Sequence, residues 1–191
     1  MRRRSALLGV GGLLAALLAA ATVLAATAWQ TVLASSGIEF TGTLDGGDFT
    51  GRFRVFDAGI TFDPADLGAS RFEVVVETGS ADTADLDRDA ELKGADFFAV
   101  DRWPTATYQA SDFVATGPGR FEARGKLTIR GVTRDLPVTF AFRAPGDGRS
   151  AALTGEATIR RLDFGVGQGE WQDTKWLAND VRVQFELVLK K

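Results

Sequence analysis

Histidine and cysteine are both absent from this chain of 191 residues. Without histidine the chain lacks the usual proton shuttle near neutral pH, and a serine hydrolase with a histidine base is excluded. Without cysteine there is no thiol nucleophile, no soft metal ligand and no disulfide. A domain of this size buries enough surface to fold without covalent cross-links, so ordinary packing must supply its stability.

An excess of positive charge is also lacking. The chain carries 22 Lys and Arg against 25 Asp and Glu, for a formal net charge of −3, which argues against nucleic acid as a partner.

Because histidine and cysteine are absent, carboxylates are the main candidates for acid–base chemistry, and Asp163, Glu170 and Asp173 lie close together in the sequence. Acidic residues in a polar loop more often serve solvation, but an enzyme acting through these carboxylates is one alternative.

The first 28 residues are typical of a secretory signal peptide. Arg2–Arg4 are followed by an uncharged run rich in Ala and Leu, which ends in a small-x-small site at Ala26–Ala28. The run is long for a signal peptide, so an uncleaved membrane anchor through residues 6–28 is the alternative. Both interpretations place residues 29–191 in the periplasm or in another exported compartment, soluble if the segment is cleaved and anchored if it is not.

The exported part alternates between apolar and polar residues in one segment after another. The clearest example is residues 119–143, where two alternating runs flank Gly131 and predict an antiparallel hairpin with one apolar face. We count about eight or nine such strands, and one short helical insert between Ser80 and Phe98, where Ser80–Thr83 could cap a helix. This pattern predicts an all-β antiparallel fold, either a sandwich or a closed barrel that leaves no exposed edges.

The apolar faces define a candidate interior. Its predicted members are Phe40, Phe53, Phe62, Phe72, Val74, Val76, Tyr108, Leu127, Ile129, Phe140, Phe142 and Phe185. These side chains could fill a small barrel completely, or they could line a long cavity for one lipid. Small residues on the inward parity favour free space, and these are Gly51, Ala123, Gly125, Gly155 and Ala157.

Two charged residues fall on the apolar parity of a late strand. Arg161 follows Ile159 in phase, and Asp163 follows Arg161. A bulge could turn Arg161 outward, or a salt bridge could hold it at the end of the barrel. The functional alternative places both residues at the mouth of a cavity, where they would contact a polar or anionic head group.

Several segments, in this order, resemble the YceI-like family. The matching stretches are Trp29 with Ser36, Ile38 and Phe40; Gly51–Phe53; Ile60–Pro64; Thr83, Arg88–Asp89, Leu92, Asp96–Phe98 and Pro104; Gly125–Thr133; and Ile159, Arg161 and Asp163–Gly167. The chain departs from the family pattern at Ser35, where histidine is common, and at Tyr108, where phenylalanine is usual.

The resemblance implies a lipocalin-like antiparallel barrel of about eight strands over residues 29–191. It also implies binding of a polyisoprenoid lipid, such as a quinone or a polyprenyl phosphate, by a carrier or storage protein, and a homodimer. It supplies no catalytic residue, no metal and no cofactor besides the bound lipid, so we expect a protein that is not an enzyme. A filled barrel that serves as an interaction or stress-response module is the main alternative.

Overall fold

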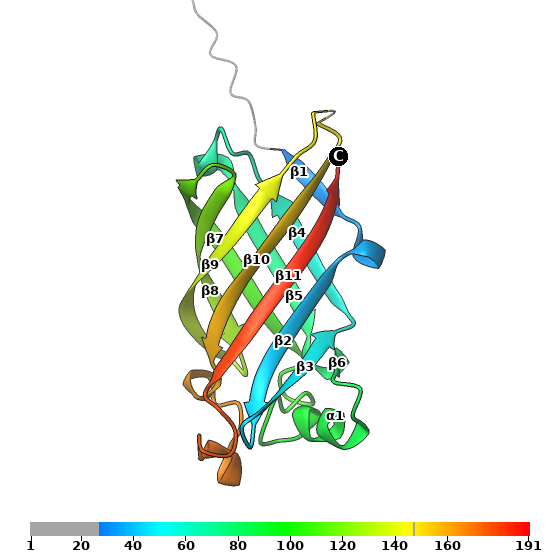
Figure 1. The fold of residues 1–191 in the computed structure, drawn as a ribbon, viewed down its shortest axis with the longest axis vertical. Coiled ribbons are helices and arrows are strands. Elements are labelled where there is room, and N and C mark those ends of the chain that lie inside the picture. The colour runs from blue at the N-terminus through cyan, green and yellow to red at the C-terminus, as the bar shows by residue number, and fades with distance from the viewer. Residues whose placement is uncertain (1–26, 147) are drawn as a thin grey trace, which may run out of the picture.

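The structure is a computed structural model that describes residues 27–146 and 148–191 (Figure 1). The expected signal or anchor segment at residues 1–28 lies almost entirely outside the described residues, so it stays a prediction. Within the described ranges, no helix is both long enough and apolar enough to cross a membrane.

Eight antiparallel strands close into a barrel, which confirms the predicted fold class. β11 pairs with both β10 and β1, and this second pairing closes the ring. The strands follow one another around the barrel as β1 (Ala28–Thr31), β4 (Phe56–Thr61), β5 (Arg71–Glu77), β7 (Thr105–Gly117), β8 (Arg120–Ile129), β9 (Val132–Arg143), β10 (Ser150–Arg160) and β11 (Asp180–Lys190).

Three further strands extend this wall toward the end of the barrel that is lower in Figure 1. β2 (Gly37–Leu44) pairs with the first half of β11, β3 (Gly47–Phe53) pairs with β2, and the short β6 (Ala81–Asp82) pairs with β3. The sequence alternation changes parity between Phe53 and Phe56, and the chain bends there from β3 into β4.

The helical insert lies at the lower end (Figure 1) and begins later than predicted. α1 spans Leu86–Lys93, and its N-cap is Asp85, whose carboxylate accepts a hydrogen bond from the Arg88 amide at 3.0 Å. The predicted cap at Ser80–Thr83 was wrong: Ser80 ends the 3-10 helix η3 (Thr78–Ser80), Ala81 and Asp82 pair with β3, and Thr83 contacts α1 through Asp89. Thr83 donates its amide and its hydroxyl to the Asp89 carboxylate, both at 2.7 Å.

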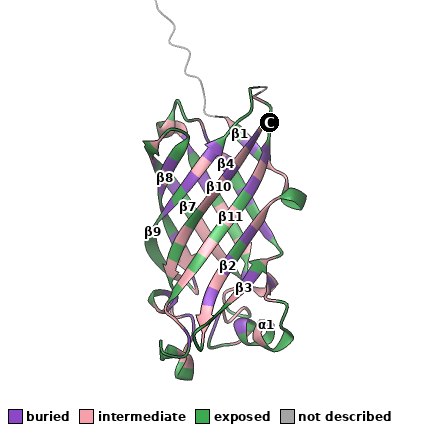
Figure 2. Cartoon of the chain, viewed as in Figure 1, coloured by how far each residue is buried: buried purple, intermediate pink, exposed green. Residues whose placement is uncertain are grey.

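Burial alternates along the strands, as the sequence periodicity predicts (Figure 2). At the upper end the buried faces meet in a packed aromatic cluster around Phe62, whose side chain is fully buried. The Phe62 ring lies 4.9 to 5.9 Å, centroid to centroid, from the rings of Phe72, Phe113, Phe121, Phe140 and Phe142. Most of these pairs are edge-to-face, a favourable geometry for aromatic rings. This half of the barrel is filled.

Candidate functional site

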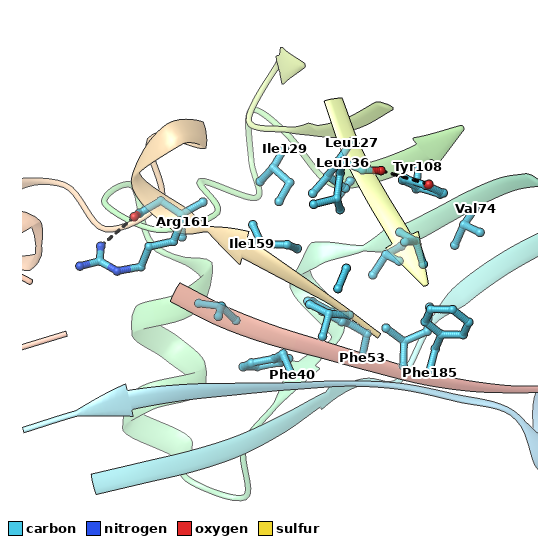
Figure 3. A pocket seen from close by; sticks show the side chains of 18 of the residues that line it. Phe40, Phe53, Val74, Tyr108, Leu127, Ile129, Leu136, Ile159, Arg161 and Phe185 are labelled. Atoms are coloured by element: carbon cyan, nitrogen blue, oxygen red, sulfur yellow. Dashed lines mark hydrogen bonds between the residues drawn. The ribbon is translucent and has the colours of Figure 1, made fainter. Parts of the chain in front are cut away.

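The lower half of the barrel is hollow. It contains a cavity of about 210 Å³ whose walls present only apolar surface. Figure 3 shows side chains from several strands converging on this space. Nine of the predicted interior residues line it, namely Phe40, Phe53, Phe72, Val74, Val76, Tyr108, Leu127, Ile129 and Phe185. The structure thus brings most of the predicted set together around one cavity.

Three predicted residues do not line the cavity. Phe62, Phe140 and Phe142 belong to the aromatic cluster that fills the upper half. Strand parity shows which face a side chain occupies, but it carries no information on how far along the barrel axis that side chain lies. The sequence therefore selected inward residues correctly and could not divide them between a filled and a hollow half.

The inward glycines make room for aromatic rings and not for a ligand. A Cβ atom at Gly51 would lie 2.3 Å from the Phe40 ring, and one at Gly125 would lie 2.4 Å from the Tyr108 ring. Gly155 is similarly blocked by the Thr139 carbonyl at 2.4 Å. Ala123 is fully buried in the upper cluster, so of the five small residues only Ala157 borders the cavity.

The lower end of the cavity is lined by residues that the sequence analysis did not select. Leu92, Phe97 and Phe98 reach it from the insert, and Val166 and Leu177 reach it from the segment between β10 and β11. The signal in the sequence was a few large apolar residues within otherwise polar stretches. Because large apolar residues are usually buried, these could have been assigned to the end of the barrel, packed over its apolar interior.

Tyr108 shows how the wall stays apolar although it contains a hydroxyl group. Its Oη lies 3.1 Å from the carbonyl oxygen of Ala123 and 3.2 Å from that of Leu136, and it can donate its single hydroxyl proton to either. Burial, followed by the negative charge of Glu122, raises the pKa of Tyr108 well above its ordinary value of 10.0. The phenol is therefore neutral and engaged with the backbone.

Arg161 borders the cavity, as its sequence position suggested, but its guanidinium is hydrogen-bonded to the protein backbone. Its side chain is only 4% exposed, and its guanidinium points away from the cavity toward the backbone (Figure 3). It donates at 2.6 to 3.4 Å to the carbonyl oxygens of Val166, Gly167, Trp171, Leu177 and Ala178. Burial lowers the pKa of Arg161. Each N–H group of the guanidinium is bonded to the segment 166–178, so none is left for a ligand. The Arg161 side chain is thus neither turned outward by a bulge nor held by a salt bridge, the two other expectations from the sequence.

The three candidate carboxylates also lie away from the cavity. Asp163, in the 3-10 helix η4 (Arg161–Phe164), is exposed and lies 4.0 Å from the Arg160 guanidinium. Glu170 and Asp173 are exposed, and Asp173 accepts a hydrogen bond from the Lys175 amide in a local turn. None of these carboxylates lines the cavity. Across the described ranges, no cluster of acidic residues could hold a metal ion.

The model of the YceI-like domain family matches residues 29–189, which is nearly the whole described barrel. The chain belongs to this family. A UPF0312 protein of Vibrio cholerae is 33% identical over 120 residues, and one of Pseudomonas aeruginosa is 35% identical over 120 residues. Each alignment covers 61% of this chain and 64% or 62%, respectively, of the relative, so the match spans less than two thirds of these curated proteins.

Solved structures share the fold. Burkholderia cenocepacia BcnA is 29% identical, with a TM-score of 0.80, over 83% of this chain and 99% of that one. A domain from Saccharophagus degradans described as polyisoprenoid-binding is 14% identical, with a TM-score of 0.68, over 85% of this chain and 97% of that one. At such low identity the second likeness shows the fold alone.

Proposed function

We propose that this YceI-like protein binds the apolar tail of a prenyl lipid in the lower cavity and carries or stores that lipid. The observation that carries the proposal is a hollow with entirely apolar walls inside a barrel whose other half is tightly packed. An apolar cavity holds water poorly, because water there finds no hydrogen-bond partners. An apolar chain that enters it gains burial at about 0.8 kcal/mol per CH₂ group.

The cavity volume limits how much of the tail is enclosed. Typical pockets for small ligands measure about 300–1,000 Å³, and this cavity, at about 210 Å³, lies below that range. We infer that it encloses a short segment of the tail. A longer tail requires the half-buried rings of Phe53, Phe98 and Phe185 to move, or it extends out of the barrel.

The polar groups around the cavity favour binding without catalysis. The hydroxyl of Tyr108 and the guanidinium of Arg161 are both hydrogen-bonded to the backbone, and the candidate carboxylates lie outside. The description of the Saccharophagus degradans domain as polyisoprenoid-binding supports the choice of ligand class. Export to the periplasm, anchoring through residues 6–28 and a homodimer belong to the same proposal, and each rests on the sequence analysis.

Native mass spectrometry, combined with organic-solvent extraction of the purified protein, tests this function. We expect a co-purified lipid with a prenyl tail, or uptake of added farnesol at one molecule per chain. If no prenyl lipid co-purifies and farnesol does not bind, the carrier proposal is wrong, and a barrel that acts as an interaction module becomes the better explanation.

A further inference from the structure

The barrel wall has a seam on the side of the cavity. β9 and β10 pair only between residues 139–143 and 152–156, although β9 begins at Val132 and β10 continues to Arg160. Below the Thr139–Glu156 pair, each strand therefore has a hydrogen-bonded neighbour on one side only. Pro137 lies in this unpaired stretch of β9, and proline, which lacks an N–H group, is found in sheets mainly at edges.

The seam lies directly in the cavity wall. Leu136 and Val138 on the β9 side and Ala157 and Ile159 on the β10 side all line the cavity. Below the seam, η4 packs against β9, so the unpaired stretch is bounded at both ends. Only side chains, with no backbone ladder, separate the cavity from solvent over this stretch, and side chains can move aside at a smaller cost than paired strands.

Arg134 is an exposed cation on the cavity-facing side of β9. It pairs directly with Leu127 of β8, and directly opposed residues in a sheet share a face. Leu127 is buried in the cavity wall, whereas Arg134 is exposed, which places its side chain at the open edge of the wall.

The charge of Arg134 is not neutralised by the protein. Its only hydrogen bond in the described part of the chain is to the carbonyl oxygen of the adjacent Thr133, at 3.1 Å, and it makes no ion pair there. The neighbouring carboxylate of Asp135 is bonded to Lys126 at 2.6 Å, and this contact lowers the pKa of Asp135. Across the seam, Arg160 is exposed and lies 4.0 Å from Asp163. The edge of the seam thus presents the guanidinium of Arg134, a positive charge without an ion-pair partner among the described residues, beside an apolar cavity.

We propose that the lipid's head group leaves the cavity through the seam between β9 and β10 and that Arg134 binds it, which selects a prenyl phosphate over a neutral prenyl lipid. This inference rests on the proposed function and specifies its ligand class. A guanidinium offers several N–H donors in a planar fork, which suits the oxygens of a phosphate group. The apolar tail then occupies the cavity while the phosphate stays at the solvated edge.

The test compares farnesyl phosphate with farnesol, which have the same tail, by titration calorimetry. We expect the wild-type protein to bind farnesyl phosphate about tenfold more tightly, and Arg134→Gln to lose this preference while binding farnesol within about twofold of wild type. Added salt should weaken phosphate binding and leave farnesol binding nearly unchanged. Arg143→Gln is the matched control, because Arg143 is exposed on the outward parity at the other end of β9.

The position of the head group gives a second readout. Because the chain has no cysteine, a spin label attached through Thr158→Cys, on the exposed side of β10 beside the seam, marks a single place. It should broaden the phosphorus NMR signal of bound farnesyl phosphate more than a label at Glu73→Cys, on β5 across the barrel, does.

The outcomes separate this inference from the proposed function. If both ligands bind equally well, if Arg134→Gln keeps the phosphate preference, or if the label on β5 broadens the signal as much as the label on β10, the head-group inference is wrong and the carrier proposal stands. If neither ligand binds, the proposed function fails and this inference fails with it.

Discussion

Arg161, the first residue of η4, illustrates how one side chain organises the lower end of the barrel. Five carbonyl oxygens from the segment 166–178 converge on its guanidinium, and this segment supplies Val166 and Leu177 to the cavity wall. A buried cation without a carboxylate partner is stable here because each N–H group meets a carbonyl dipole. Arg161 is a positioning residue for the lower end of the cavity.

Replacing Arg161 with lysine should therefore destabilise the fold although the charge is kept. An ammonium group cannot reach five carbonyl oxygens, so several would be left buried without a donor, at a cost of about 3 kcal/mol in the free energy of unfolding. Urea denaturation measures this, with Arg160→Lys on the exposed side as the control. A stability equal to wild type, combined with loss of phosphate preference, would instead indicate a direct role in head-group binding.

Tyr108 is the single tyrosine of the chain, so its ionisation can be followed by ultraviolet absorbance. Burial raises its pKa in the folded protein above the ordinary value of 10.0. The folded state holds the phenolic proton more tightly than the unfolded state, so the stability that the neutral phenol contributes is fully present below pH 10.0 and is lost as the pH rises beyond it.

We expect the folded protein to show little tyrosinate absorbance at pH 10.0, whereas the urea-unfolded chain should be about half ionised there. Tyr108→Phe should remove this part of the pH dependence of unfolding. A titration midpoint near 10.0 in the folded protein would show that the hydroxyl is open to solvent, and the wall beside Leu136 would then be polar.

At the scale of the strands, β10 has two inward positions, two residues apart, that differ in the space available for a larger side chain. Gly155 faces the Thr139 carbonyl, whereas Ala157 borders the cavity. Ala157→Phe should fill free space, lower farnesol affinity at least about tenfold and change stability by less than about 1 kcal/mol.

Gly125→Ala is the matched contrast, because its new Cβ would meet the Tyr108 ring at 2.4 Å. It should cost about 1–3 kcal/mol in the free energy of unfolding. Thermal unfolding and farnesol titration of both variants provide the comparison. Equal destabilisation by the two substitutions would mean that the space beside Ala157 is filled.

The elements also show how far the sequence could be interpreted. Alternation in β8 and β11 predicted inward faces correctly because a strand has a period of two residues in any surroundings. The cap at Asp85 was missed because Ser80–Thr83 offered similar capping residues, and only the pairing of Ala81–Asp82 with β3 decides between them. Arg134 could have been found, since it is a charge on an apolar parity, just as Arg161 is.

In the molecule as a whole, the barrel strands follow the same alternation of apolar and polar residues. The inward side chains nevertheless form two different regions, a packed upper half and a lower half with a cavity. Aromatic residues fill the upper half, while the lower half keeps an apolar cavity that residues of the insert also line. The division depends on contacts between strands distant in sequence, such as Phe62 with Phe121 and Phe140. Local periodicity contains no information about such contacts.

Methyl NMR during a farnesol titration tests most directly whether the apolar ligand binds inside the cavity. The account predicts shifts for Val74, Ile129 and Val183, which line the cavity, and unchanged signals for Leu189, which is fully buried and lies outside the cavity lining. Shifts confined to exposed residues, or no shifts at saturating farnesol, would contradict it.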